Sequence, residues 1–415
     1  MSKYKIVGQK ELAGEVRIGG AKNAALKIIA ASVMADSPST IHDVPRIKDI
    51  EILEEIIVKA GGKVDVDGNT VRIDPRGIKT TKLDEELTKK LRGSIVLTGP
   101  MLSKFNEVEF AQPGGCLIGA RPIDTHLDVF RQFGIVLIEH GESYELKGKP
   151  KAGEVIMSEL SVTATENAIM SAVLSEGETK IYAGATEPEI HDLVTYLNKM
   201  GAKITADHSH TYTVVGVDKL KGAEHTIIPD RIETGTYLLI GLATNSEITI
   251  NNVRPETLMH LIKKLRNAGA KLTVGKDSIT TQKGQTYKAI DIDTRTFPGF
   301  PTDLQSQYAV YSTTTDGKTR IFETIFESRF GYIDEIKKMG ANIEVEGPHI
   351  VNIDGPIELN GTNLDANDIR GGAALVLAGL IAKGETTING IELIERGYEG
   401  MEEKLKALGA DIEKI

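Results

Sequence analysis

The chain has 415 residues, 40% of them hydrophobic and 26% charged, which is typical of a folded protein that is too long for one hydrophobic core. The formal net charge of −10, without any basic block, excludes nucleic acid as an expected partner. The apolar run at 373–382 has half the length of a membrane span, the N-terminus lacks a secretory pattern, and the single cysteine excludes an intrachain disulfide, so we expect a cytoplasmic protein without membrane association.

An amphipathic helix that ends in a glycine and precedes a short strand recurs six times along the chain. The glycines follow one another at intervals of 67 to 73 residues, at Gly61, Gly134, Gly201, Gly269, Gly340 and Gly409. Glycine suits the end of a helix because it adopts the left-handed conformation without a Cβ clash. This spacing predicts six copies of one unit of about 70 residues.

A second, more apolar helix is expected in every copy, at 24–35, 94–103, 166–175, 235–244, 303–312 and 371–382. A helix with so little polar surface is buried on nearly all sides. One unit therefore reads as strand, buried helix, strand, surface helix, strand and strand. We predict an α/β fold of two domains with three units each, in which sheets surround the buried helices.

The segment Gln112–Asp124 departs from this repeat. It places Cys116 among glycine and proline residues, which disfavour both helix and strand. A surface loop with an inert cysteine is one interpretation. The nearby Arg121 favours another, because a cation stabilises a thiolate and suits an anionic substrate.

Charged and polar residues stand at or near the starts of the buried helices, at Lys22, Asn23, Arg92, Glu233, Asp303, Asp368 and Arg370. Capping explains Asp303. Cations at a helix N-terminus oppose the helix dipole, so Lys22, Arg92 and Arg370 indicate a functional role. Several N-termini that point to one region would form an anion site. Arg329 and Arg396 lie in turns, where either a site or a solvated charge is possible.

Seven short motifs carry a family resemblance, at Gly20–Ala24, Pro113–Cys116, Gly119–Pro122, Pro229–Gly235, Phe300–Asp303, Asp368–Arg370 and Glu395–Tyr398. With them the chain resembles the UDP-N-acetylglucosamine 1-carboxyvinyltransferase family from Lys5 to Ile415. The resemblance implies the two-domain inside-out α/β barrel. It also implies a first domain at 22–229 and a second that combines 1–21 with 230–415.

The implied activity is transfer of the enolpyruvyl group of phosphoenolpyruvate to the 3-hydroxyl of UDP-N-acetylglucosamine. Phosphate leaves by addition and elimination, in the first committed step of peptidoglycan synthesis. We expect these two small molecules as partners, a monomer, and no cofactor or metal, although the sequence itself does not reveal the oligomeric state.

The resemblance also implies roles for single residues. Phosphoenolpyruvate would be bound by Lys22, Arg121 and Arg396. Cys116 would add to phosphoenolpyruvate, assist proton transfer and be alkylated by fosfomycin. Asn23 and Asp303 would lie at the sugar, with Asp303 facing the acceptor hydroxyl. The nucleotide sugar would contact Arg92, Pro122, Asp124, His126, Val162 and Ile325. The supporting charges would be Arg329, Asp368 and Arg370. The catalytic residues would be Cys116, Asp303, Lys22 and Arg396.

Asp303 is expected to have a low pKa at a helix start, and therefore mainly to orient the acceptor hydroxyl. Departures from the family pattern remove no charged group. Lys27 replaces a common proline and Gly20 a common serine, and Gly93 and Gly371 stand where alanine is frequent. Each glycine would cost up to about 1 kcal/mol within a helix.

Three other interpretations remain. A shikimate-type enolpyruvyl transferase shares the fold but has no counterpart of the Pro-Gly-Gly-Cys loop. A non-catalytic paralogue that binds nucleotide sugar would be marked by loss of the cysteine or of an arginine. A purely structural repeat protein leaves the cations at the helix starts unexplained.

Overall fold

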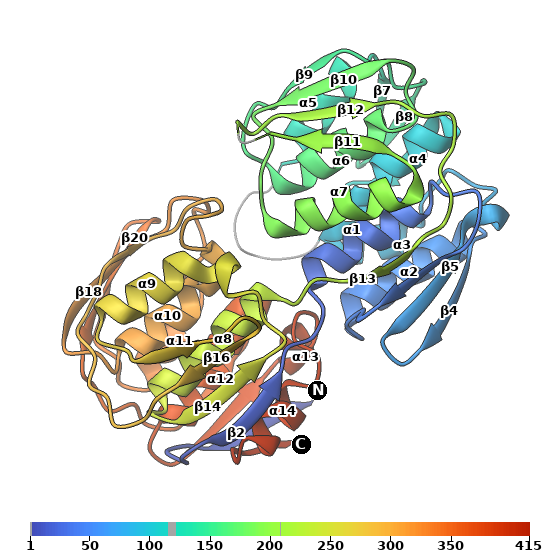
Figure 1. Ribbon diagram of the computed structural model, residues 1–415. Helices are drawn as coiled ribbons and strands as arrows, with labels where there is room; N and C mark the ends of the chain where they lie inside the picture. Colours follow the sequence, from blue (N-terminus) through green and yellow to red (C-terminus); the bar gives the residue numbers. More distant parts are fainter. Residues whose placement is uncertain (1, 115–121, 208) are drawn as a thin grey trace. The chain divides into compact units, whose positions relative to one another are not determined.

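The structure is a computed structural model that describes residues 2–114, 122–207 and 209–415. The chain divides into two compact units (Figure 1). One contains the described residues up to Gly19 together with Pro229–Ile415, and the other contains those from Gly20 to Ile228. Each unit has its own cluster of buried hydrophobic side chains. Cys116 and Arg121 lie outside the described residues.

The six predicted apolar helices are all present in the described residues. They are α1 (Lys22–Ser32), η2 with α4 (Arg92–Leu97 and Thr98–Phe105), α6 (Val162–Ala172), α8 (Arg231–Ala243), η4 with α10 (Thr302–Leu304 and Gln305–Ser312) and α12 (Ile369–Ile381). In the first set η2 contacts both α1 and α6, and in the second set α8, α10 and α12 contact one another. The prediction of two groups of three buried helices is confirmed.

The amphipathic helices that precede the repeat glycines are also present. They are α2 (Lys48–Lys59), α5 (Asp124–Gln132), α7 (Pro188–Met200), α9 (Met259–Asn267), α11 (Ile333–Lys338) and α14 (Met401–Ala407). All six glycines have positive φ, between 74° and 109°. A residue with a side chain would be strained at a positive φ, so the backbone conformation at the end of each helix explains why glycine recurs there. Shorter helical turns are η1 (Pro75–Gly77), α3 (Glu85–Lys90), η3 (Pro255–Leu258) and α13 (Ile391–Ile394).

Three sheets belong to the unit that begins at Gly20. Their strand orders are β13-β3-β5-β4, β6-β8-β7 and β11-β12-β10-β9. The strands are β3 (Ser39–His42), β4 (Lys63–Asp67), β5 (Thr70–Asp74), β6 (Glu107–Ala111), β7 (Val136–His140), β8 (Ser143–Lys147), β9 (Glu154–Ile156), β10 (Glu178–Tyr182), β11 (Lys203–Ala206), β12 (Tyr212–Val215) and β13 (Glu224–Thr226).

The other unit also has three sheets, with the orders β21-β22-β1-β23, β15-β16-β14-β2 and β17-β18-β20-β19. The strands are β1 (Lys3–Val7), β2 (Ala13–Arg17), β14 (Glu247–Asn251), β15 (Leu272–Val274), β16 (Ser278–Thr281), β17 (Ile292–Asp293), β18 (Gly317–Phe322), β19 (Ile343–Glu346), β20 (Ile350–Gly355), β21 (Asn363–Asp365), β22 (Glu385–Asn389) and β23 (Asp411–Lys414). In each unit three sheets surround three buried helices, which is the inside-out α/β barrel.

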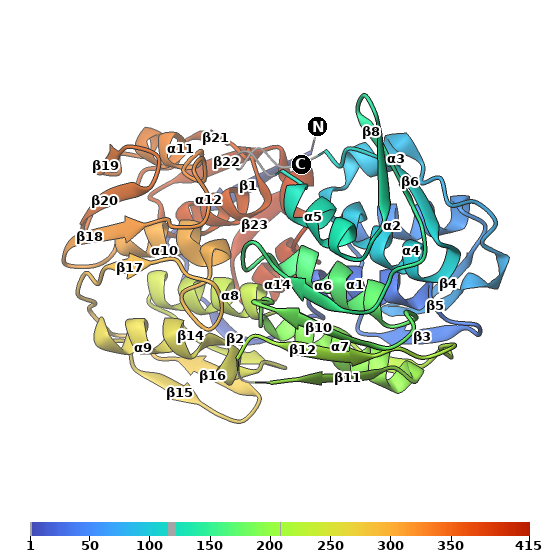
Figure 2. The ribbon, with the colours of Figure 1, turned by 90° about the horizontal axis from the view of Figure 1, so that it is seen from above.

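The N-terminal strands pair with strands of the unit that contains residues 229–415. β1 is antiparallel to both β22 and β23, with Tyr4 opposite Ile388 and Lys414. β2 is parallel to β14, and Figure 2 shows the blue β2 beside the yellow-green β14. The unit formed by 229–415 is therefore completed by the first residues of the chain.

Candidate active site

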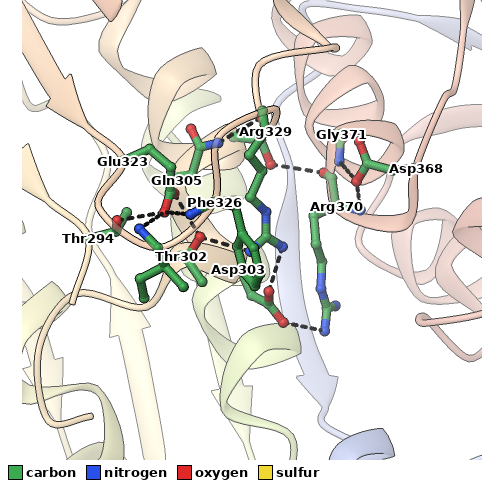
Figure 3. Close-up of polar contacts among 12 residues, drawn as sticks. Thr294, Thr302, Asp303, Gln305, Glu323, Phe326, Arg329, Asp368, Arg370 and Gly371 are labelled. Carbon is green, nitrogen blue, oxygen red and sulfur yellow. Dashed lines mark hydrogen bonds and ion pairs between the residues drawn. The ribbon is translucent and has the colours of Figure 1, made fainter. Parts of the chain in front are cut away.

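Asp303 is held between two arginines at the start of the buried helix formed by η4 and α10 (Figure 3). Its Oδ1 accepts a hydrogen bond from Nη2 of Arg329 at 2.5 Å, and its Oδ2 accepts one from Nη2 of Arg370 at 3.1 Å. The two arginine side chains are 5% and 8% exposed, whereas that of Asp303 is 27% exposed. The structure thus brings together three residues that the sequence analysis had singled out separately.

The two guanidinium groups determine the charge of this carboxylate. Burial on its own would raise the pKa of Asp303, but the positive charges of Arg329 and Arg370 outweigh it and hold the pKa well below the ordinary value. Asp303 is therefore ionised throughout the physiological range. Such a carboxylate accepts hydrogen bonds strongly but is a weak general base.

Arg329 is held by contacts of its guanidinium and of its backbone carbonyl. Its Nη1 donates to Oγ1 of Thr302 at 2.8 Å, and its guanidinium lies 5.1 Å from the ring centre of Phe326. Its carbonyl oxygen accepts from Nε2 of Gln305 at 3.0 Å, and Oε1 of Gln305 accepts from the hydroxyl of Tyr332 at 2.7 Å. A buried arginine needs such partners because its charge cannot be removed by deprotonation.

Arg370 stands in the first turn of α12. The N-cap is Asp368, whose carboxylate accepts from the backbone nitrogens of Arg370 at 2.8 Å and Gly371 at 2.9 Å. This cap compensates the cation at a helix N-terminus, where the dipole disfavours it. The guanidinium also lies 5.3 Å from the ring centre of Tyr398. Asp368 thus supports Arg370 through the backbone.

In the other unit, Lys22 begins α1 and is buried. Its Nζ lies 2.6 Å from Oδ2 of Asp49 in the first turn of α2, and both side chains are less than a tenth exposed. The carboxylate of Asp49 neutralises the charge of Lys22, which the positive end of the helix dipole at the N-terminus of α1 would otherwise disfavour. Asn23, the next residue of α1, is partly exposed.

Arg92 bridges the two ends of the segment that contains Cys116. Its Nη1 donates to the carbonyl of Pro113 at 3.2 Å and its Nη2 to the carbonyl of Pro122 at 3.1 Å. One guanidinium therefore contacts the chain on both sides of residues 115–121. This arrangement gives Arg92 a structural task in addition to any contact with a ligand.

His126 is buried on α5, and both of its ring nitrogens are engaged. Nδ2 of Asn167 donates to Nδ1 of His126 at 2.9 Å, so the ring proton sits on Nε2 and is donated to Oγ1 of Thr163 at 3.0 Å. Burial, assisted by the charge of Arg92, lowers the pKa of His126 to about 3. The imidazole is therefore neutral and serves as a fixed hydrogen-bonding unit.

The remaining predicted site residues differ in exposure. Pro122 and Asp124 are exposed, whereas Val162 and Arg396 are partly buried. Ile325 is 37% exposed, and its backbone nitrogen donates to Oε1 of Glu323 at 2.9 Å. Their contacts with substrates stay predictions.

Sequence reasoning missed several partners of these residues, namely Asp49, Asn167 and Glu323. A local pattern does not reveal them, because each contacts a residue far away in the chain. One further pair did leave a signal. Lys27 interrupts the apolar helix α1, and its Nζ lies 3.5 Å from Oε2 of the fully buried Glu166 on α6. A lysine inside such a helix indicates an acidic partner.

Two features are absent from the described residues, a cluster of metal ligands and a membrane-spanning helix. The histidine, cysteine, aspartate and glutamate side chains of these residues do not form a group of three or more that would hold a metal ion. Among the helices of residues 2–114, 122–207 and 209–415, each is too short or too polar to reach across a lipid bilayer.

Comparisons with known proteins agree on one family. Residues 6–405 match the family model described as EPSP synthase (3-phosphoshikimate 1-carboxyvinyltransferase). UDP-N-acetylglucosamine 1-carboxyvinyltransferase of Halothermothrix orenii is 43% identical, with both chains covered in full. UDP-N-acetylglucosamine 1-carboxyvinyltransferase 3 of Caldanaerobacter subterraneus is 44% identical, again with full coverage of both chains.

Solved structures extend the comparison to the fold. The enolpyruvyl transferase NikO from Streptomyces tendae has a TM-score of 0.90 at 26% identity, with 100% of this chain and 98% of that chain covered. EPSP synthase from Acinetobacter baumannii has a TM-score of 0.78 at 18% identity, with both chains covered in full. The second likeness concerns the fold alone.

Proposed function

This chain belongs to the enolpyruvyl transferase family, and we propose that it transfers the enolpyruvyl group of phosphoenolpyruvate to the 3-hydroxyl of UDP-N-acetylglucosamine. Phosphate is released, and the product enters peptidoglycan synthesis. Full-length identity of 43% and 44% to two relatives named for this reaction supports the choice of acceptor. The single structural observation that supports it best is the ionised Asp303 between Arg329 and Arg370.

The reaction needs a fixed anion beside the acceptor hydroxyl. The hydroxyl oxygen attacks carbon 2 of phosphoenolpyruvate while carbon 3 takes up a proton, which gives a tetrahedral intermediate. The bond from carbon 2 to the phosphate oxygen then breaks as carbon 3 loses a proton. Asp303 orients the hydroxyl and accepts its proton late, because the low pKa of Asp303 makes early proton transfer unfavourable.

Cationic residues bind the anionic groups of both substrates in this proposal. Lys22, Arg121 and Arg396 bind the phosphate and carboxylate of phosphoenolpyruvate. Such preorganised charges act where negative charge is held or moved during the reaction. Asn23 binds the sugar of the acceptor, and Cys116 assists proton transfer. The nucleotide sugar is also contacted by Arg92, Pro122, Asp124, His126, Val162 and Ile325. Arg329, Asp368 and Arg370 form the charge network that supports these substrate-binding residues.

The geometry refines two of these assignments. Because the guanidinium of Arg92 binds the carbonyls of Pro113 and Pro122, Arg92 aids the nucleotide sugar by shaping the chain on both sides of residues 115–121. Because both nitrogens of His126 are used inside the protein, His126 acts by positioning α5 and α6. A monomer in the cytoplasm, with domains at 22–229 and at 1–21 with 230–415, is part of the same proposal.

A phosphate-release assay with both substrates tests the proposal. Wild-type protein is expected to release phosphate only when phosphoenolpyruvate and UDP-N-acetylglucosamine are both present, and Cys116→Ser and Arg396→Ala are expected to reduce the rate. Release with shikimate 3-phosphate as the acceptor would favour the shikimate-type reaction. A folded protein that binds the nucleotide sugar without releasing phosphate would be a non-catalytic paralogue.

A further inference from the structure

Glu323 follows strand β18 and its side chain is completely buried. Its carboxylate accepts four hydrogen bonds, and Figure 3 shows Thr294, Thr302 and Phe326 around it. Oε1 accepts from Oγ1 of Thr294 at 2.9 Å and from the backbone nitrogens of Ile325 at 2.9 Å and Phe326 at 3.2 Å. Oε2 accepts from Oγ1 of Thr302 at 2.7 Å. A buried carboxylate with this many donors is a specifically built feature, because an unsatisfied one would be costly.

The backbone of Glu323 is held as firmly as its side chain. Its nitrogen donates to the carbonyl of His349 at 2.8 Å, and Nδ1 of His349 donates to the carbonyl of Glu323 at 2.8 Å. The main chain from which the Glu323 side chain projects is therefore held in place beside β18. From there the carboxylate reaches the turn that contains Thr302 and Asp303 and the turn that precedes Arg329.

The direction of the hydrogen bonds through Thr302 is determined. An arginine can only donate, so Oγ1 of Thr302 accepts from Nη1 of Arg329. The single hydroxyl proton of Thr302 is then free to go to Glu323, which as a carboxylate can only accept. Three residues thus form one directed chain from Arg329 through Thr302 to Glu323, and Arg329 also donates to Asp303.

We infer that Glu323 is a positioning residue that acts through Thr302 on Arg329 and so sets the orientation and charge of the Asp303 carboxylate. This inference rests on the proposed function, in which Asp303 orients the acceptor hydroxyl. Glu323 itself is buried among protein groups and does not touch substrate. The same carboxylate fixes the turn at Ile325, so one buried anion couples two segments that the proposed function uses.

A glutamine at position 323 cannot reproduce the arrangement. Its Oε1 would still accept from Thr294 and the two backbone nitrogens, but its amide group would face Thr302. The amide would then donate to Oγ1 of Thr302, and the hydroxyl proton of Thr302 would lose its acceptor. If the amide were flipped, its hydrogens would face three donors instead. Glu323→Gln therefore disturbs Thr302 with almost no change in volume.

Four variants separate positioning from mere stability. Thr302→Val removes the hydroxyl between Glu323 and Arg329, and Thr302→Ser keeps it. Thr294→Val is the matched control, since Thr294 donates to the same carboxylate without a hydrogen bond to Arg329 or Asp303. Glu323→Gln tests the carboxylate directly. Thermal unfolding of each variant measures the structural cost.

We expect Thr302→Val and Glu323→Gln to lower kcat about tenfold or more with less than a threefold change in the KM for phosphoenolpyruvate. The limb that protonation of Asp303 gives to the pH profile of kcat/KM should also lie at higher pH than in wild type. Thr302→Ser should restore most of kcat, and Thr294→Val should lose thermal stability without either kinetic change. Equal kinetic effects in Thr302→Val and Thr294→Val, or no rescue by serine, would overturn the inference.

A readout independent of turnover keeps this test apart from that of the proposed function. The charged groups that act on Asp303 are Arg329, Arg370 and Arg231 from α8. The ¹³C signal of the Asp303 carboxyl, assigned with Asp303→Asn, reports its titration without substrate. A higher pKa in Thr302→Val but not in Thr294→Val supports the inference even if wild type releases no phosphate. An unchanged titration in both overturns it.

Discussion

Nη2 of Arg329 lies 2.5 Å from Oδ1 of Asp303, and the arginine side chain is almost completely buried. A charged pair in this setting holds its geometry because its separation would leave the arginine charge buried without this partner. The carboxylate nevertheless keeps part of its surface exposed, so it has room for one more donor.

Asp303→Asn is expected to lower kcat by about 100-fold or more, in the range of a lost acid–base group. Asparagine keeps the shape but has no charge to orient the hydroxyl and accept its proton. Since the two arginines lower the pKa of Asp303, the carboxylate stays ionised down to acidic pH, and wild type should show no Asp303 limb in kcat/KM above pH about 4. Asp293→Asn is a matched control, because Asp293 pairs with two arginines at the surface. Near-full turnover of Asp303→Asn would remove Asp303 from the mechanism.

Arg370→Lys is expected to reduce kcat/KM about tenfold although it conserves the charge. Lysine cannot place a planar group over Tyr398 while donating to Oδ2 of Asp303. Steady-state kinetics should be compared with those of Arg320→Lys, in which an arginine over the ring of Phe322 at the surface is replaced. If both variants retain wild-type kinetics, the planar contact at Arg370 has no role in the reaction.

The ring of His126 is expected to remain neutral, with its proton on Nε2, from pH 8 down to pH 5. Burial lowers the pKa of His126 to about 3. Below pH about 6.5 the unfolded chain binds a proton at this histidine, whereas in the folded protein the imidazole stays neutral down to about pH 3. This histidine therefore costs stability increasingly as the pH falls from about 6.5 towards 3. ¹⁵N NMR of the imidazole, assigned with His126→Gln, checks both statements. An imidazolium signal above pH 5 would contradict them.

Glu166 is expected to make stability fall as the pH rises. Burial raises the pKa of Glu166 from 4.5 to about 8, although the charge of Lys27 opposes the increase. Between these values the unfolded chain has released a proton that the folded protein keeps, so the free energy of unfolding declines with pH. Urea unfolding from pH 5 to pH 9 should show a shallower decline for Glu166→Gln than for wild type.

Two further variants complete that series. Lys27→Met should extend the decline to higher pH, because removing the cation raises the pKa of Glu166 further. Glu51→Gln, which neutralises an exposed glutamate of α2, should follow the wild-type curve. Parallel curves for all four proteins would show that the buried pair does not titrate in this range.

Fosfomycin is expected to modify Cys116 covalently. The chain contains one cysteine, so an intact-mass shift after incubation identifies the site without peptide mapping. Inactivation should follow the same time course, because the adduct would occupy the position proposed for phosphoenolpyruvate. Cys116→Ser serves as the control and should gain no mass. A protein that stays unmodified and fully active would exclude this role for the cysteine.

The repeat could be predicted because its signals are local. Gly61 and its five equivalents end helices in a conformation that glycine favours, and the buried helices are rich in apolar residues and lack a charged outer face. The charges of Asp303, Arg329 and Arg370 were also visible in the sequence. Their meeting was not, because Arg370 reaches Asp303 across 67 residues.

Other parts of the candidate site have no local signature. Glu323 follows an ordinary strand, and its four donors come from three separate segments. Asp49 reads as a helix-start acid, which hides its contact with Lys22. A carboxylate at a helix start is explained equally well by capping. Only the folded arrangement distinguishes a cap from a partner of a buried cation.

The position of β1 has a consequence for how the protein is made. A ribosome releases β1 several hundred residues before its neighbours β22 and β23. Residues 20–228 can assemble during synthesis, whereas β1 stays unpaired until β22 and β23 have been made. A bulky fusion that keeps β1 from pairing would therefore separate β22 from β23 in the sheet β21-β22-β1-β23. The unit that contains residues 229–415 would then fail to fold.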